Sequence, residues 1–169
     1  MGTILDADSA PALVINDAPA VTEGGNEVFT ISLSAASAVP VTVSFATANG
    51  SASAGSDYTS KSGTVSFAAG QTSQTVTVAT LTDGTFEGTE NFVVNLSGAT
   101  GAGIADSQGV GTILDADSQP TLAVNDAQPV TEGGNEVFTI SLSGPSATAV
   151  TVNFATANGT ASADRKSVV

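Results

Sequence analysis

The feature that most constrains this chain is that long stretches of its sequence occur twice. Three stretches return at one constant offset: GTILDADS from Gly2 to Gly111, VTEGGNEVFTISLS from Val21 to Val130, and FATANG from Phe45 to Phe154. A solenoid unit has about 20–50 residues, and this period is much longer, long enough for a domain with its own core. The sequence therefore predicts a tandem array of whole domains.

The offset divides the chain into four expected segments. Residues 1–9 match the end of a repeat and are expected to be the C-terminal remnant of a preceding one, whereas residues 10–117 form a complete domain. Residues 118–163 correspond to the N-terminal half of a second domain, whose three strands cannot close a sandwich and leave their edges open. Residues 164–169 (DRKSVV) depart from the repeat, and we expect them to be a translated sequencing adapter.

Short segments with alternating apolar and polar residues predict β-strands rather than helices. The expected strands of the complete repeat cover residues 13–15, 29–33, 41–45, 65–67, 76–78, 92–96 and 110–114. Seven short strands separated by turn residues favour an all-β fold, an immunoglobulin-like sandwich with Greek-key connections. One complete tandem repeat is thus expected, followed by a truncated second.

The composition excludes several classes of function. The chain has 16 acidic and 3 basic residues, a net charge of −13, and neither cysteine nor histidine. Nucleic acid and anionic membrane surfaces repel such a chain, and no apolar run reaches the roughly 20 residues of a membrane span. Disulfides, zinc–thiolate sites and Ser-His-Asp triads are impossible without these residues. We therefore expect no nucleic-acid partner, no direct membrane insertion and no enzyme of these types.

The acidic residues of the first copy are predicted to gather at one end of the sandwich. If successive strands run antiparallel, alternate connections share an end, and that end receives Asp17, Glu23, Asp57, Asp83, Glu87, Asp115 and Asp117. Only Asp106 falls at the opposite end. Asp17 is as well explained as a turn residue, and Glu27 and Glu90 are expected to be solvated strand residues. Clustered carboxylates on loops suit Ca²⁺, which accepts 6–8 oxygens in flexible geometry, better than octahedral Mg²⁺.

Several motifs in this order resemble the Calx-beta repeat. They are VTEG at 21–24, GSDY at 55–58, DGTFEGTENF at 83–92 and GTILDAD at 111–117. The resemblance implies an immunoglobulin-like sandwich that binds Ca²⁺. It also implies a ligand set of Glu23, Asp57, Asp83, Glu87, Asp115 and Asp117 with the carbonyl of Thr85, and Glu90 as an accessory ligand at best. Thr82-Asp83-Gly84 and Asp115-Ala116-Asp117 carry fewer acids than strong binders of this family, which predicts fewer ions or weaker binding.

Together these features predict a calcium-binding structural repeat that stiffens an extended, adhesin-like multidomain protein. We expect that protein to be secreted or attached to the surface of a bacterium, with calcium ions and the neighbouring repeats as partners and an unknown adhesive target. Two other classes of function compete with this one. A glycosidase with two carboxylates is disfavoured because aromatic residues make up only 5% of the chain, and we expect the protein not to be an enzyme. A carbohydrate- or protein-recognition module remains the alternative, although the loops at the Asp106 end lack the aromatic and arginine anchors typical of binding sites.

Overall fold

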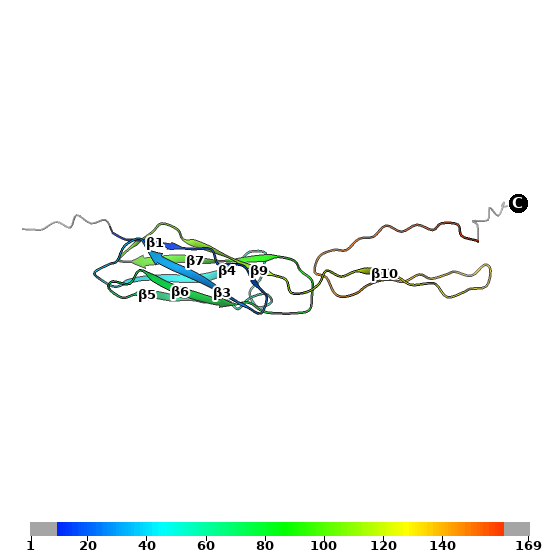
Figure 1. Cartoon of the computed structure of the whole chain (residues 1–169), viewed down its shortest axis with the longest axis horizontal. Helices are drawn as coiled ribbons and strands as arrows, with labels where there is room; N and C mark the ends of the chain where they lie inside the picture. Colours follow the sequence, from blue (N-terminus) through cyan, green and yellow to red (C-terminus); the bar gives the residue numbers. More distant parts are fainter. Residues whose placement is uncertain (1–9, 161–169) are drawn as a thin grey trace, which may run out of the picture.

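The computed structural model describes residues 10–160, and this part of the chain is all-β (Figure 1). The strands are β1 (Ala12–Ile15), β2 (Val21–Thr22), β3 (Asn26–Leu33), β4 (Val41–Asn49), β5 (Ser62–Phe67), β6 (Ser73–Ala79), β7 (Glu90–Thr100), β8 (Gly103–Ile104), β9 (Gln108–Leu114), β10 (Leu122–Val124) and β11 (Ile140–Leu142). Every strand expected in the complete repeat is present. No helix in the described part is long and apolar enough to cross a membrane. The expected remnant at 1–9 and the expected adapter at 164–169 lie outside the described residues.

Two sheets form the sandwich of the complete repeat. One has the strand order β6-β3-β1-β8 and the other has the order β2-β9-β7-β4-β5. The first strand of the repeat is divided between the two sheets. Its first part, β1, pairs with β3 in one sheet, and its second part, β2, pairs parallel with β9 in the other. This order and these crossovers confirm the immunoglobulin-like Greek-key sandwich.

The core follows the alternation that the sequence predicted, because successive residues of a strand point to opposite faces of the sheet. Phe29 and Ile31 of β3 and Val43 of β4 are completely buried. Phe92 of β7 contacts Phe29 edge to face, with the ring centroids 5.8 Å apart. Tyr58 stacks on Phe92, with the ring centroids 4.3 Å apart. These rings lie near the end of the sandwich where β9 finishes, and they brace the loops there.

The second copy forms much less structure, although its sequence repeats that of the first. Its β10 and β11 pair with one another as an isolated antiparallel ladder. Phe154 is 85% exposed, whereas the equivalent Phe45 of the complete repeat is 8% exposed. The difference arises because residues 118–160 lack counterparts of β5, β6, β7 and β9, against which these side chains pack in the first copy. The structure thus has one closed sandwich followed by an open half.

Candidate metal centre

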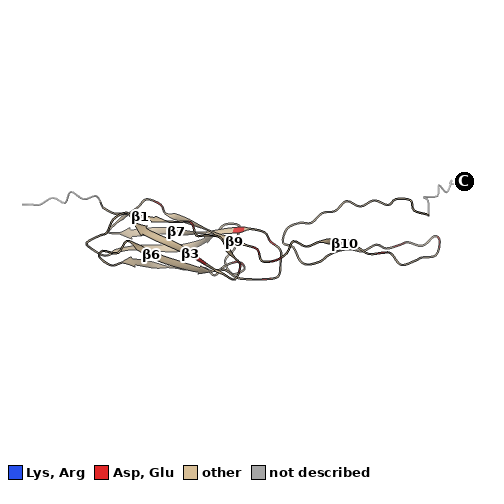
Figure 2. Ribbon diagram, viewed as in Figure 1, with Lys and Arg blue, Asp and Glu red and all other residues tan. Residues whose placement is uncertain are grey.

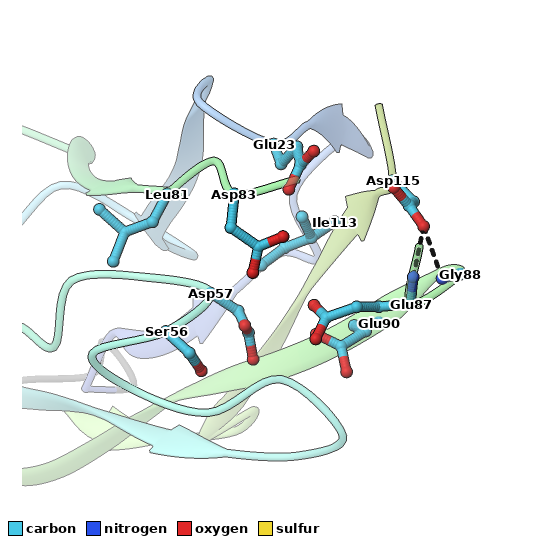
Figure 3. Close-up of a pocket in the computed structure, with 10 residues that line it drawn as sticks. All are labelled: Glu23, Ser56, Asp57, Leu81, Asp83, Glu87, Gly88, Glu90, Ile113 and Asp115. Carbon is cyan, nitrogen blue, oxygen red and sulfur yellow. Dashed lines mark hydrogen bonds between the residues drawn. The ribbon is translucent and has the colours of Figure 1, made fainter. Parts of the chain in front are cut away.

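Four connections meet at the end of the sandwich where β9 finishes, and they bring acidic side chains together. Figure 2 shows the red of Asp and Glu on the ribbon at the end of β9. We call this group the acidic pole: Glu23, Asp57, Asp83, Glu87, Glu90, Asp115 and Asp117. Its members come from the turn after β2, the β4–β5 loop, the β6–β7 loop with the start of β7, and the chain that leaves β9. Six of them line a small pocket together with Ser56, Leu81, Gly88 and Ile113 (Figure 3). Residues distant in sequence therefore share one site.

Two groups of three carboxylates lie within the acidic pole. In the first, one oxygen from each of Glu23, Asp115 and Asp117 lies within 4.8 Å of the other two. In the second, Asp57, Glu87 and Glu90 meet the same criterion. Two unit charges at that separation repel by about 3 kcal/mol at an effective dielectric of 20, before screening by salt. Each group thus offers three carboxylate oxygens, and a divalent cation held between them would remove their repulsion.

Asp115 organises the loop opposite it. Its Oδ2 accepts hydrogen bonds from the N–H groups of Glu87 (2.7 Å) and Gly88 (2.8 Å), which are drawn in Figure 3. Its Oδ1 accepts a third from Asp117 N–H at 2.7 Å. Burial acts to raise the pKa of Asp115, but the N–H groups of Gly88, Glu87 and Asp117 outweigh it and lower the pKa. Asp115 therefore stays ionised and fixes the β6–β7 loop against the exit of β9.

Glu23 joins the same exit from the other side. Its N–H donates to the carbonyl of Leu114 at 2.9 Å, and its Oε1 accepts the N–H of Ala116 at 3.2 Å. Asp117 lies next to Glu23 and Asp115, and its Oδ2 is buried without a hydrogen-bond partner. A buried carboxylate oxygen that nothing satisfies is costly. A cation held between Glu23, Asp115 and Asp117 is the kind of partner that this oxygen lacks.

Asp57 is held by the loop that carries it. Its Oδ2 accepts the N–H of Ser53 at 2.6 Å. The next residue, Tyr58, is buried and donates its hydroxyl to Asn49 Oδ1 at 2.7 Å while it stacks on Phe92. The core thus positions the β4–β5 loop, and Asp57 faces Glu90 at the start of β7.

Two members of the second carboxylate group, Glu87 and Glu90, have raised pKa values. Burial raises the pKa of Glu90 to about 7, with further contributions from the charge of Asp57, a hydrogen bond to Asp57, and the charges of Glu87 and Asp115. Burial also raises the pKa of Glu87, helped by the charges of the neighbouring acids. Like charges in a shared site favour protonation in this way. Protonation of Glu90 therefore lowers the repulsion between Glu90 and Asp57.

The structure brings together most of the residues that the sequence singled out, with differences at four positions. Asp83 lines the pocket but is exposed, and its Oδ1 accepts the N–H of Thr85 at 2.7 Å. Thr85, whose carbonyl was an expected ligand, is not among the pocket residues. Asp17 does not join the acidic pole, because its carboxylate accepts the N–H of Val110 within β9 at 2.8 Å. Glu90, expected to be a solvated strand residue, lies inside the pocket.

The sequence of this module is similar to that of known proteins. The sequence matches the Calx-beta domain over residues 6–128 and again over residues 115–166. The chain belongs to the Calx-beta family. Sodium/calcium exchanger 1 of the cat is 42% identical over 83 residues, which are 49% of this chain and 8% of the exchanger. The rat exchanger is 39% identical over 90 residues, or 50% of this chain and 9% of the exchanger.

Solved Calx-beta domains share the fold. The crystal structure of the apo form of the Calx CBD1 domain has a TM-score of 0.61 at 22% identity, covering 64% of this chain and all of that one. The calcium binding domain CBD12 of CALX1.1 has a TM-score of 0.61 at 24% identity, covering 72% of this chain and 53% of that one. At this level of identity the likeness concerns the fold alone, and it agrees with the sandwich described above.

The relatives correct one expectation from the sequence. The predicted location outside the cell or on a bacterial surface is wrong, because the relatives that the chain matches are sodium/calcium exchangers of mammals. The chain spans less than a tenth of the length of these exchangers. The composition could not have revealed this, since an acidic, cysteine-free chain is compatible with many locations.

Proposed function

We propose that this chain is a calcium-binding structural repeat, in which the ion fixes the junction between one Calx-beta domain and the next. The observation that carries the proposal is the convergence of two groups of three carboxylates from four separate connections. The proposed ligands are Glu23, Asp57, Asp83, Glu87, Asp115 and Asp117, with the carbonyl of Thr85 and with Glu90 added from its place in the pocket. Binding rather than catalysis is the role that this arrangement supports.

The chemistry of the donors favours Ca²⁺. The donors are oxygens on loops, and Ca²⁺ takes 6–8 such ligands in irregular geometry, whereas Mg²⁺ demands a regular octahedron and retains its waters. The presence of CBD12, a calcium binding domain, among the structural neighbours supports the same ion. Asp83 lines the pocket, and its carboxylate accepts the N–H of Thr85, so both belong to the loop that would carry the ion.

Junction stiffening follows from a contact between the metal loop and the next repeat. The Phe86 N–H donates to the carbonyl of Pro145 at 3.3 Å, and the Ala147 N–H donates to the carbonyl of Phe86 at 3.0 Å. Phe86 lies between Thr85 and Glu87, so an ion that fixes this loop also fixes its partner segment. We place the domain boundary after residue 117, with 10–117 as the complete unit and 118–163 as the first half of its neighbour.

The stiffening is tested by placing two fluorophores on the full chain, one in each copy, and measuring their distance distribution with millimolar calcium and with chelator. Calcium is expected to narrow the distribution in the wild type and in Asp106→Asn, which changes the opposite end. Glu87→Gln is expected to abolish the narrowing. If calorimetry detects bound calcium but the distribution does not change, the stiffening role fails while the site stands. If calorimetry detects no binding, the site fails as well.

A second candidate function is calcium sensing, which the relationship to sodium/calcium exchangers favours. The two functions differ in the affinity that they require. Sensor sites bind calcium with a Kd of about 10⁻⁷–10⁻⁵ M, and structural modules with a Kd of about 10⁻⁴–10⁻³ M. We propose the weaker range, because Ala116 and Gly84 stand where further acids would strengthen binding. A Kd below about 10⁻⁵ M from calorimetry would replace the structural role with the sensing role.

A further inference from the structure

Glu27 is a buried acid that the metal centre does not use. The sequence suggested a solvated strand residue, and this is wrong: Glu27 is 0% exposed. The reason is its register in β3, where it falls on the same face as Phe29, Ile31 and Leu33. The alternation of the strand thus carries a carboxyl group into the apolar interior.

One oxygen of Glu27 accepts a hydrogen bond from a β9 amide that has no neighbouring strand to pair with. Its Oε1 accepts the N–H of Thr112 in β9 at 2.9 Å. Along the same strand, Asp17 accepts the N–H of Val110. Both amides lie in β9 beside the segment that crosses from β1 to β2, where Ala18 N–H donates to the carbonyl of Val110. The strand β2 itself pairs with β9 only at Ile113 and Leu114. The two acids therefore satisfy amides that the crossing leaves without a backbone acceptor.

The other oxygen of Glu27 has no partner. Its Oε2 is buried without a hydrogen bond. The ionisable groups on the elements packed around it are all acids: Asp17 after β1, Glu23 after β2, Glu90 on β7 and Asp115 after β9. Lys61 is the single basic residue of the described part, and its Nζ donates to the carbonyl of Thr77 on the edge strand β6. No cation within the described residues is therefore placed to compensate a charge on Glu27.

From this geometry we propose that Glu27 is a proton-binding site of the folded domain, separate from the metal centre, which takes up a proton when the domain folds. A neutral carboxyl keeps one oxygen for Thr112 and avoids an unpaired charge in the interior, where such charges are costly. Burial raises the pKa of Glu27, and the N–H groups of Thr112 and Val21 act in the opposite direction with smaller effect. Folding thus couples to proton uptake at a position that has no cation.

The coupling has a defined sign. A carboxyl whose pKa is higher in the folded than in the unfolded state favours folding at low pH. This stabilisation is complete below the unfolded pKa of about 4.5 and is lost as pH rises through the folded pKa. Between the two values, the unfolding constant increases tenfold for each pH unit, the equivalent of one proton. Because Glu27 lies outside the metal centre, this dependence persists when calcium saturates the acidic pole.

The second copy supplies a matched control. Glu136 lies in the same sequence, NEVFTISL, but is exposed. We would measure chemical denaturation of the full-length wild type, Glu27→Gln and Glu136→Gln from pH 5 to 8.5, with chelator and with saturating calcium. Glutamine imitates the protonated acid, since it keeps an oxygen for Thr112 and carries no charge.

The expected result is that the unfolding constant of the wild type rises with pH relative to Glu27→Gln, by up to tenfold per pH unit, in both calcium conditions. Glu136→Gln should follow the wild type. A ratio between wild type and Glu27→Gln that is constant with pH would overturn the proposal. If Glu27→Gln does not fold, ¹³C NMR titration of labelled glutamate carboxyls in the wild type decides: the buried carboxyl must titrate above pH 4.5, and titration at or below it would overturn the proposal. If the chain binds no calcium, the proposed function fails, but the pH dependence of the unfolding constant expected for Glu27 does not change.

Discussion

Replacing Asp115 by alanine is predicted to destabilise the domain even without calcium. The carboxylate of Asp115 holds the loop between β6 and β7 through the N–H groups of Glu87 and Gly88. Alanine leaves both donors without this acceptor. The substitution therefore separates the structural task of Asp115 from any contact with an ion.

The size of the effect follows from the two bonds that cross between loops. A hydrogen bond to a charged group contributes about 1.5–3 kcal/mol, and the lower value applies because Asp115 is only half-buried and solvent screens its charge. Two such bonds give a loss of about 3 kcal/mol, which is an upper limit because alanine also removes the repulsion between Asp115 and its neighbouring carboxylates. A domain of this size loses about 4 °C in Tm per kcal/mol, so we expect Asp115→Ala to lower Tm by up to about 12 °C.

The assay is thermal denaturation by circular dichroism in chelator at pH 7, with Asp106→Ala as the control. Asp106 is exposed at the opposite end and accepts only the N–H of Gln108, at 3.2 Å. The control is expected to lie within about 2 °C of the wild type. Because the pKa of Asp115 is lowered, its contribution is complete above the unfolded pKa and is lost as pH falls through the folded pKa. Equal midpoints for the two variants would refute the reasoning.

Three further predictions concern other parts of the structure. In chelator at pH 8, Glu90→Gln is expected to be more stable than the wild type by about 1–2 kcal/mol. The reason is that protonated Glu90 stabilises the folded domain, and this stabilisation is lost as pH rises from about 4.5 through the raised pKa of about 7. Urea denaturation at pH 5 and 8 measures the difference. Gly111→Ala is expected to lower the free energy of unfolding by about 1–3 kcal/mol, because the added Cβ would lie 2.8 Å from the Phe92 ring. Thermal denaturation measures this loss. Ala147→Pro removes the N–H that donates to the carbonyl of Phe86 and is expected to broaden the fluorophore distances across the junction without changing Tm.

Each of these has an outcome that contradicts it. A constant difference between Glu90→Gln and the wild type at both pH values would mean that Glu90 is ionised throughout. Gly103→Ala is the control for Gly111, since a Cβ at Gly103 meets no atom within 4 Å, and equal stability of the two variants would remove the packing argument. Unchanged distances in Ala147→Pro would show that the junction does not depend on this bond.

The sequence predicted the fold because alternation on a two-sided sheet is a local property. Phe29, Ile31 and Leu33 identify a strand and its buried face without knowledge of any partner strand. The repeat also predicts that one domain ends after residue 117. The sequence could not indicate that the first strand is divided into β1 and β2, because β2 has only two residues, too few to show a period.

The acidic pole was predictable from topology, since alternate connections of an antiparallel sandwich share an end. The exceptions are residues whose role depends on a single contact. Asp17 serves an amide of β9 that the crossing edge leaves open, and Glu27 is inward-facing by register although its residue type suggested a solvated position. Glu90 also looked like an ordinary strand residue, and only the approach of Asp57 from another loop places it in the pocket. Such pairings depend on loop conformations that residue patterns do not encode.

The central claim is tested most directly by the Tm of the full chain in 10 mM CaCl₂, in 10 mM MgCl₂ and in chelator at one ionic strength. With a Kd of about 10⁻⁴ M, calcium at about 100-fold excess stabilises the folded domain by about 2.7 kcal/mol for each ion. This corresponds to a rise of about 11 °C over chelator, and magnesium should give much less. An identical Tm in all three solutions would mean that the acidic pole binds no divalent ion, and the account would be wrong.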